Sequence, residues 1–167
     1  GQGVANAVGM AMAEVHLAAR YNRGDLQVID HMTFGICSDG DLHEGIASEA
    51  ASLAGHLGLG KLCFLYDDNS ITIEGKTDLA WSESVSQRFE AYGWHTQIVD
   101  GHDRLAVRRA INAARAETLK PSIICCRTHI GHGSPNKQDS ASSHGSPLGA
   151  AEIKLVKDAI GWPVEPA

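Results

Sequence analysis

The sequence lacks several features that would assign it to a broad protein class. No apolar run approaches the roughly 20 residues of a membrane span, so no membrane partner is expected. The residues Gly1-Gln2-Gly3 have neither the basic head nor the apolar segment of a signal peptide. The four cysteines show no C-x-x-C spacing, which favours buried, reduced thiols in a cytoplasmic protein over a disulfide framework.

Basic residues are also too few for a nucleic-acid-binding protein. Lys and Arg total 14 against 20 Asp and Glu, and the formal net charge is −6. Proteins that bind the phosphate backbone usually carry a basic face, so no nucleic-acid partner is expected. The 167 residues are 43% hydrophobic, enough for about one domain with a sizeable core. Because the chain does not begin with Met, we expect a piece of a longer protein or a processed product.

Apolar runs that read as buried strands alternate with amphipathic segments that read as helices. Strands are predicted at residues 32–37, 61–66, 94–99 and 122–127, and helices at 4–20, 44–57, 85–92, 104–119 and 150–160. Ile46, Ala50, Leu53 and Leu57 are expected on one face of the second helix. In the fourth helix, Leu105, Ile111 and Ala114 are expected to face inward, and residues 131–148 are expected to form a loop. This alternation predicts an α/β fold, a parallel β-sheet flanked by helices on both faces.

Two polar clusters each follow a predicted strand. Asp39 begins a turn after the first strand, and Asn69 lies thirty residues later, after the second. The carboxyl ends of parallel strands meet at one sheet edge, where ligands usually bind. The Asp39 carboxylate, the Asn69 amide oxygen and the Ile71 carbonyl would suit Mg²⁺ that also holds a diphosphate. Each cluster alone is a common turn sequence, but the two together at this spacing favour a metal–diphosphate site.

The same residues resemble a known cofactor motif. Ser38-Asp39-Gly40 with the distant Asn69 is similar to the thiamine-diphosphate motif, which usually reads Gly-Asp-Gly followed by Asn. Residues 44–57, 66–75, 88–94, 133–137 and 144–148 resemble segments of transketolase, so the resemblance covers nearly the whole chain. Ser38 stands in place of the usual first glycine, which is tolerated if its backbone is not left-handed.

The resemblance implies a cofactor and a set of ligands. The cofactor would be thiamine diphosphate, held through Mg²⁺ or Ca²⁺. The residues implied are Asp39, Asn69 and the Ile71 carbonyl for the metal, Gly3 and Gly40 for the diphosphate, and Ile73 and Ile130 for the thiazolium ring. A Gly1-Gln2-Gly3 turn before a helix is expected to present Gly3, and backbone N–H groups there and at Gly40 would meet the phosphates.

The resemblance also implies an activity and two catalytic residues. The reaction would be transfer of a two-carbon ketol unit from a ketose phosphate to an aldose phosphate, in the pentose phosphate pathway and the Calvin cycle. His144 would face the donor sugar. Glu44 would belong to an acidic network at a homodimer interface.

Residues 1–167 would form part of a single diphosphate-binding domain, with no second domain present. The start of that domain, the pyrimidine-binding domain and the C-terminal domain of the family are not in this sequence. The chain would therefore need companion segments or a second subunit across the dimer interface, and the isolated chain is predicted to be inactive.

Two alternatives to transketolase stay open at this point. One is a related thiamine-diphosphate enzyme such as dihydroxyacetone synthase. The segment 133–137 argues against a third relative, 1-deoxyxylulose-5-phosphate synthase. The other alternative is a non-catalytic fragment or a subunit of a split enzyme. His129 and His132 flank a glycine near the third loop, where a structural role and a position beside the cofactor are both considered.

Overall fold

The computed structural model describes residues 1–163 and divides into two compact units. The first comprises Gly1–Asp68 and Glu83–Arg127, and the second comprises Asn69–Ser82 and the chain from Thr128 onward. No helix among residues 1–163 is long and apolar enough to cross a membrane.

A four-stranded sheet forms the centre of the first unit. Its strands are β1 (Thr33–Ser38), β2 (Leu62–Asp68), β6 (Ser122–Arg127) and β5 (His95–Asp100), in the order β1-β2-β6-β5. All three pairings are parallel, and Ser38 is in register with Asp67, which is in register with Cys126. The carboxyl ends of the strands therefore lie along one edge, as the sequence predicted.

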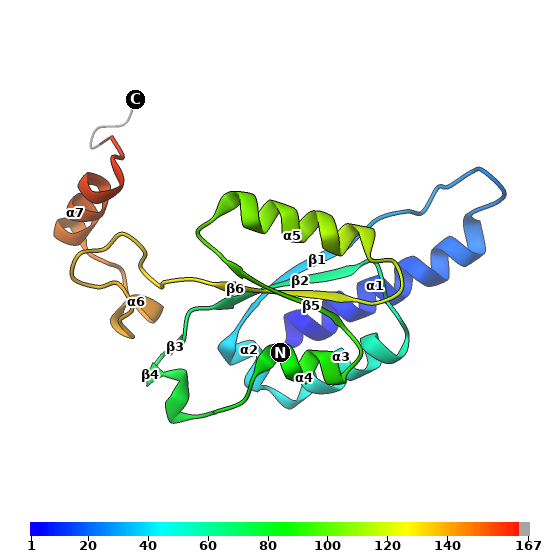
Figure 1. The fold of residues 1–167 in the computed structure, drawn as a ribbon, viewed down its shortest axis with the longest axis horizontal. Helices are drawn as coiled ribbons and strands as arrows, with labels where there is room; N and C mark the ends of the chain where they lie inside the picture. The colour runs from blue at the N-terminus through cyan, green and yellow to red at the C-terminus, as the bar shows by residue number, and fades with distance from the viewer. Residues whose placement is uncertain (164–167) are drawn as a thin grey trace. The chain divides into compact units, whose positions relative to one another are not determined.

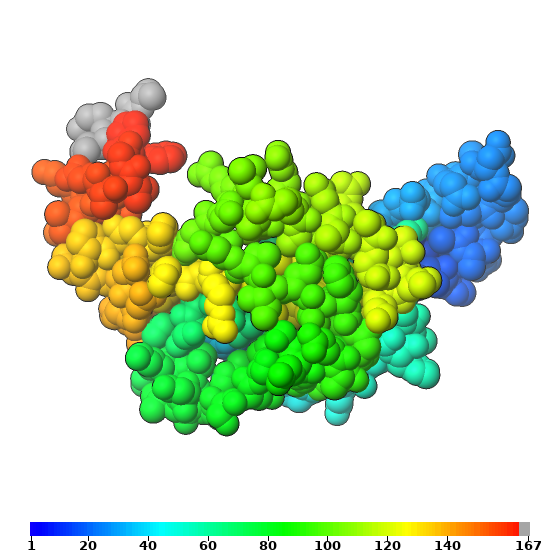
Figure 2. All heavy atoms as spheres, in the orientation of Figure 1, coloured from blue at the N-terminus to red at the C-terminus, as the bar shows by residue number. Residues whose placement is uncertain are grey.

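Helices cover both faces of this sheet. Figure 1 shows α5 (Arg104–Ala116) on one face and α1 (Gln2–Tyr21), α3 (Gly45–His56) and α4 (Val85–Ala91) on the other. Under α5, the small side chains Ala110 and Ala114 pack with Cys63, Ile124 and Cys126. The other side of α5 lies at the molecular surface (Figure 2). The predicted α/β class is confirmed, and all four cysteines are buried and free.

The apolar face expected for α3 is not the face that the helix buries. Ala50 is buried, but Ile46, Leu53 and Leu57 are 43–46% exposed, and the other buried residues are Ala47, Ala51 and Ala54. The reason is close packing, since a Cβ added at Gly55 would lie only 1.8 Å from the Tyr92 carbonyl oxygen. Larger side chains cannot occupy such a contact, so they turn outward.

The fourth predicted helix was also placed partly wrongly. Leu105 was expected inward but is 55% exposed, whereas Ala114 is buried and Ile111 packs against the buried cluster under α5, as expected. The helix ends at Ala116 rather than at residue 119, because the Glu117 carboxylate accepts hydrogen bonds from the backbone N–H groups of Leu119 and Lys120. The predicted cap is confirmed, since Asp103 accepts from Leu105 N–H at 2.8 Å and Ala106 N–H at 3.1 Å.

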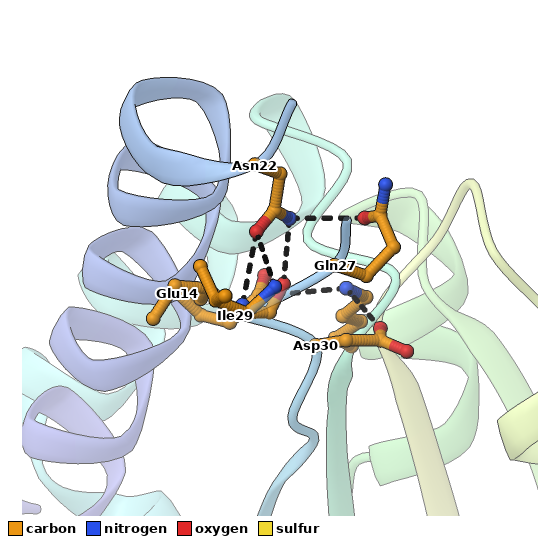
Figure 3. A network of polar contacts seen from close by, with 7 residues as sticks. Glu14, Asn22, Gln27, Ile29 and Asp30 are labelled. Carbon is orange, nitrogen blue, oxygen red and sulfur yellow. Dashed lines mark hydrogen bonds and ion pairs between the residues drawn. The ribbon is translucent and has the colours of Figure 1, made fainter. Parts of the chain in front are cut away.

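A polar network ties the end of α1 to the start of β2, away from the carboxyl edge of the sheet (Figure 3). Lys61 Nζ lies 2.8 Å from Glu14 Oε1 and 2.7 Å from Asp30 Oδ1. Asn22 Oδ1 accepts from the N–H groups of Val28 and Ile29. Glu14 is only 2% exposed, so Lys61 supplies the charge that its buried carboxylate requires.

The second unit contains short elements and one longer helix. It holds β3 (Ile71–Thr72) paired antiparallel with β4 (Gly75–Lys76), the 3₁₀ turn η1 (Thr77–Leu79), α6 (Ser142–Gly145) and α7 (Ala150–Ile160). The predicted helix at 150–160 is confirmed. The segment 131–148, expected to be a loop, includes the short helix α6.

Candidate functional site

Asp39 is the first residue of a short helix, α2 (Asp39–His43), where the sequence predicted a tight turn. Ser38 precedes it with φ −131°, so the position taken by glycine in the motif does not need a left-handed backbone here. Ser38 N–H donates to Asp41 Oδ2 at 3.0 Å, which fixes the start of the helix. The strand-to-helix junction therefore holds Asp39 at the carboxyl end of β1.

The Asp39 carboxylate is buried, and only one of its two oxygens accepts a hydrogen bond from a described residue. Its side chain is 1% exposed, and Tyr66 O–H donates a hydrogen bond to Oδ1. Oδ2 is also buried, and no described residue donates a hydrogen bond to it. Burial raises the pKa of Asp39, the nearby Asp68 and Asp67 add to the increase, and Tyr66 and His43 oppose it. A buried carboxylate oxygen without a donor, in an acidic surrounding, is suited to a cation.

The end of β2 adds further negative charge to the first unit. Asp68 pairs with Arg127 at 2.9 Å across the β2–β6 register. Burial raises the pKa of Asp68, and Arg127 opposes the increase. Because Arg127 lies beside Asp68, it offsets part of this negative charge. Asp39 Oδ2 still has no hydrogen-bond donor among the described residues.

The predicted diphosphate residues have open surroundings. A Cβ added at Gly40 or at Gly3 would meet no atom within 4 Å. Gly40 is the second residue of α2, where backbone N–H groups have no partner within the helix. Gly3 lies inside α1, which already begins at Gln2, so the turn expected at residues 1–3 is not present. Glu44 lies between α2 and α3 with its side chain 59% exposed.

In the second unit, Asn69 and Ile71 are brought together. Asn69 is 8% exposed and its Oδ1 accepts a hydrogen bond from Ile71 N–H at 2.9 Å. The intervening Ser70 has φ 62°, so the chain turns sharply at that residue. The turn therefore fixes the orientation of the Asn69 amide oxygen. Ile71 is 5% exposed and starts β3.

The remaining predicted residues of this unit lie in turns and in α6. Ile73 is 68% exposed, between β3 and β4. Ile130 is half-buried, and its carbonyl accepts from Asp139 N–H at 2.9 Å. His144 is exposed within α6. His129 Nδ1 lies 3.0 Å from both Asp139 carboxylate oxygens, and its ring lies 6.5 Å from that of His132.

Sequence reasoning missed two residues that support these positions. Tyr66 is aligned with Cys37 across the β1–β2 pair, which brings its hydroxyl to Asp39. A tyrosine within an otherwise apolar strand was the available signal, because a buried phenol needs a polar partner. Glu152 of α7 was not identified either, and nothing in its sequence surroundings marks it as buried.

The donor set fits a hard divalent cation better than a transition metal. Among residues 1–163, no group of three or more His, Cys, Asp and Glu side chains is arranged to hold a metal. The set implied by the sequence uses one carboxylate, one amide and one carbonyl oxygen, which are ligands that Mg²⁺ and Ca²⁺ accept. The unpartnered Asp39 Oδ2 is the feature of the first unit that matches this set.

Comparison with known proteins identifies the family. Residues 1–167 match the family described as transketolase, thiamine diphosphate binding domain. The chain belongs to the transketolase family. It is 54% identical over 163 residues to a transketolase from Geobacillus stearothermophilus, covering 97% of this chain and 24% of that protein.

Solved transketolase structures agree with this assignment. A transketolase from Leishmania mexicana superposes with a TM-score of 0.96 at 44% identity, covering 99% of this chain and 25% of that one. A Pichia stipitis transketolase in complex with sedoheptulose-7-phosphate gives 0.95 at 43% identity, covering 100% and 25%. The chain therefore spans about a quarter of the length of these transketolases.

Proposed function

We propose that this chain forms the metal and diphosphate half of the cofactor site of a transketolase. The whole enzyme would transfer a two-carbon ketol unit from a ketose phosphate to an aldose phosphate. The observation that carries the proposal is the buried, unpartnered Oδ2 of Asp39, in a chain of this family. Thiamine diphosphate, when bound, supplies the carbon nucleophile of the reaction, and the protein binds and orients it.

The order of the chain supports a shared metal site. Asp39 directly follows β1 and Asn69 directly follows β2, and these two strands are neighbours in the parallel sheet. We propose that Asp39, Asn69 and the Ile71 carbonyl hold Mg²⁺ or Ca²⁺. Backbone N–H groups at Gly40 and Gly3 would bind the diphosphate, where a glycine leaves room for close approach.

The other predicted residues would act at the reacting end of the cofactor. Ile73 and Ile130 would contact the thiazolium ring and exclude water from it. His144 would donate a hydrogen bond to the donor sugar or move a proton there, and its exposure leaves it accessible to substrate. Glu44, which is also exposed, would contact the second subunit.

The rest of the active site would come from protein that this sequence does not include. We propose that residues 1–167 are part of one diphosphate-binding domain, completed by companion segments and by the second subunit of a homodimer in the cytoplasm. Sugar phosphates would be the substrates, as in the sedoheptulose-7-phosphate complex of the Pichia stipitis enzyme. Dihydroxyacetone synthase and a non-catalytic fragment are not favoured, because the relatives described above are transketolases.

Calorimetry of the full-length enzyme tests the metal site. Thiamine diphosphate should bind in the presence of Mg²⁺ and bind weakly in its absence. Asp39→Ala should abolish the Mg²⁺-dependent part of binding. The matched control is His56→Ala, which removes an exposed side chain at the end of α3 and should leave binding unchanged.

Turnover provides the second arm of the test. The full-length enzyme should convert a ketose phosphate and an aldose phosphate, and His144→Ala should lower kcat. The 167-residue chain alone should show no turnover. Mg²⁺-dependent binding that survives Asp39→Ala, or full activity of the isolated chain, would show that the site is elsewhere or is complete within this piece.

A further inference from the structure

We propose that Glu152 is a positioning residue that fixes the loop carrying Ile130 and the helix carrying His144. The inference rests on the proposed function, because it assumes that His144 faces the substrate. Glu152 itself lies on α7 and would act only through its contacts with that loop.

The Glu152 carboxylate joins α7 to residues 134–136. Its Oε1 accepts hydrogen bonds from Ser134 Oγ at 2.5 Å and from Asn136 N–H at 2.9 Å. Its Oε2 accepts from Asn136 Nδ2 at 2.9 Å. Glu152 is only 8% exposed and Ser134 only 3%. Three donors on one buried carboxylate form a strong, directional attachment.

The attachment continues from residues 134–136 to α6. Ser134 Oγ also accepts from Lys137 N–H at 3.1 Å. The Lys137 carbonyl accepts from Ser143 Oγ at 2.6 Å, and Ser143 immediately precedes His144. Lys137 Nζ donates to the Leu148 carbonyl at 2.9 Å, which holds the chain on the other side of His144. A continuous path therefore runs from Glu152 to the backbone on both sides of His144.

The same loop fixes Ile130. Ser134 N–H donates to the Gly131 carbonyl at 2.9 Å, and Asp139 N–H donates to the Ile130 carbonyl at 2.9 Å. The loop is closely packed at Gly131, where an added Cβ would lie 3.1 Å from Ser143 Oγ and 3.2 Å from the Lys137 carbonyl oxygen. Gly131 also has φ 63°, which disfavours other residues. A shift of residues 134–137 must therefore move Ile130 and α6 together.

Two substitutions at Glu152 separate the hydrogen bonds from the charge. Glu152→Ala removes both acceptor oxygens, and with them all three hydrogen bonds from Ser134 and Asn136. Glu152→Gln keeps the shape and the Oε1 acceptor. Its new amide would face the Asn136 side chain, which can turn its own amide to present oxygen instead of nitrogen. Glu152→Gln is therefore expected to retain most of the kcat that Glu152→Ala loses.

Steady-state kinetics of the full-length enzyme test the positioning role. Glu152→Ala should lower kcat by about 10- to 100-fold, because misplacement of reacting groups by about 1 Å has effects of this size. Mg²⁺-dependent binding of thiamine diphosphate should change little, since the proposed metal ligands lie outside residues 128–160. The control Asp158→Ala removes an exposed acid from the same helix and should behave as the wild type.

A double-mutant cycle with His144→Ala separates positioning from general stability. If Glu152 acts through His144, Glu152→Ala should lower kcat much less in enzyme that already carries His144→Ala than in the wild type. An equal loss in both backgrounds, or no loss in either, overturns the positioning role alone. If His144→Ala leaves kcat unchanged, both this inference and the proposed role of His144 are wrong. Should Glu152→Ala fail to fold, Ser143→Ala replaces it in the same cycle, because it removes only the contact between Lys137 and α6.

Discussion

Two glycines of α3 should respond oppositely to the same substitution. A Cβ at Gly55 would lie 1.8 Å from the Tyr92 carbonyl oxygen and 3.3 Å from the Trp94 ring, whereas a Cβ at Gly45 would meet nothing within 4 Å. Neither glycine has a positive φ, so alanine is acceptable to both backbones. The difference between the two variants therefore isolates the contact between α3 and the end of α4.

The expected magnitude follows from that contact. Relaxing 1.8 Å to an ordinary C···O separation of about 3.3 Å requires a shift of about 1.5 Å. The obstacle is backbone, and Trp94 Nε1 is already held by the Ala51 carbonyl at 2.8 Å. We expect Gly55→Ala to lower the free energy of unfolding by about 3 kcal/mol, the upper part of the usual range for overpacking. Gly45→Ala should raise it by about 0.5 kcal/mol, through the lower entropy of the unfolded chain.

Urea unfolding of the two variants and the wild type, followed by far-UV circular dichroism, measures both changes. In thermal unfolding, Gly55→Ala should lower Tm by about 6–12 °C for a chain of this size. Equal stability of Gly55→Ala and Gly45→Ala would refute the reasoning, because it would mean that α3 does not approach Tyr92 this closely.

Three further outcomes are expected. Lys61→Met leaves the buried Glu14 without its cation and should lower the free energy of unfolding, measured in urea, by about 2–3 kcal/mol. The loss should be smaller than for a fully buried ion pair, because Lys61 is 40% exposed. The double variant with Glu14→Met should recover most of this stability, and failure to recover it would show that the ion pair is not the cause. Tyr66→Phe removes the hydrogen bond to Asp39 and should weaken Mg²⁺-dependent cofactor binding about 10- to 100-fold by calorimetry, so unchanged binding would contradict a metal at Asp39. Hydrogen bonds from Ser134 and Asn136 lower the pKa of Glu152 below its ordinary value of 4.5. The contribution of Glu152 to stability should therefore be present above pH 4.5 and be lost as the pH falls through the lowered pKa. Glu152→Gln should not lose stability in this acid range, and parallel pH profiles of Tm for the wild type and Glu152→Gln would contradict this expectation.

Much of the fold followed from local pattern. The strand at 122–127 and the helix at 150–160 were predicted with their observed bounds, because Pro121 precedes the strand and Gly149 and Gly161 flank the helix. Side-chain direction was less predictable. In α3, Ile46, Leu53 and Leu57 were expected on one face with Ala50, but only Ala50 is buried, and at Gly55 the close approach of the Tyr92 carbonyl leaves no room even for a Cβ. Helix periodicity identifies an apolar stripe, whereas the distance to the neighbouring element decides which residues fit beneath it.

The sequence by itself determined the alternation of strands and helices, the spacing of Asp39 and Asn69, and the family, because these are properties of residue order. Only the tertiary structure decided which oxygen of the Asp39 carboxylate accepts a hydrogen bond. Parallel pairing of β1 with β2 brings Tyr66 to one carboxylate oxygen and leaves the other buried without a donor among the described residues. The tertiary structure likewise decided that the Glu152 carboxylate binds residues 134–136, since Glu152 is distant from them in the sequence. Hydrogen bonds of this kind depend on distances of a few ångströms between separate elements, which no local pattern of residues specifies.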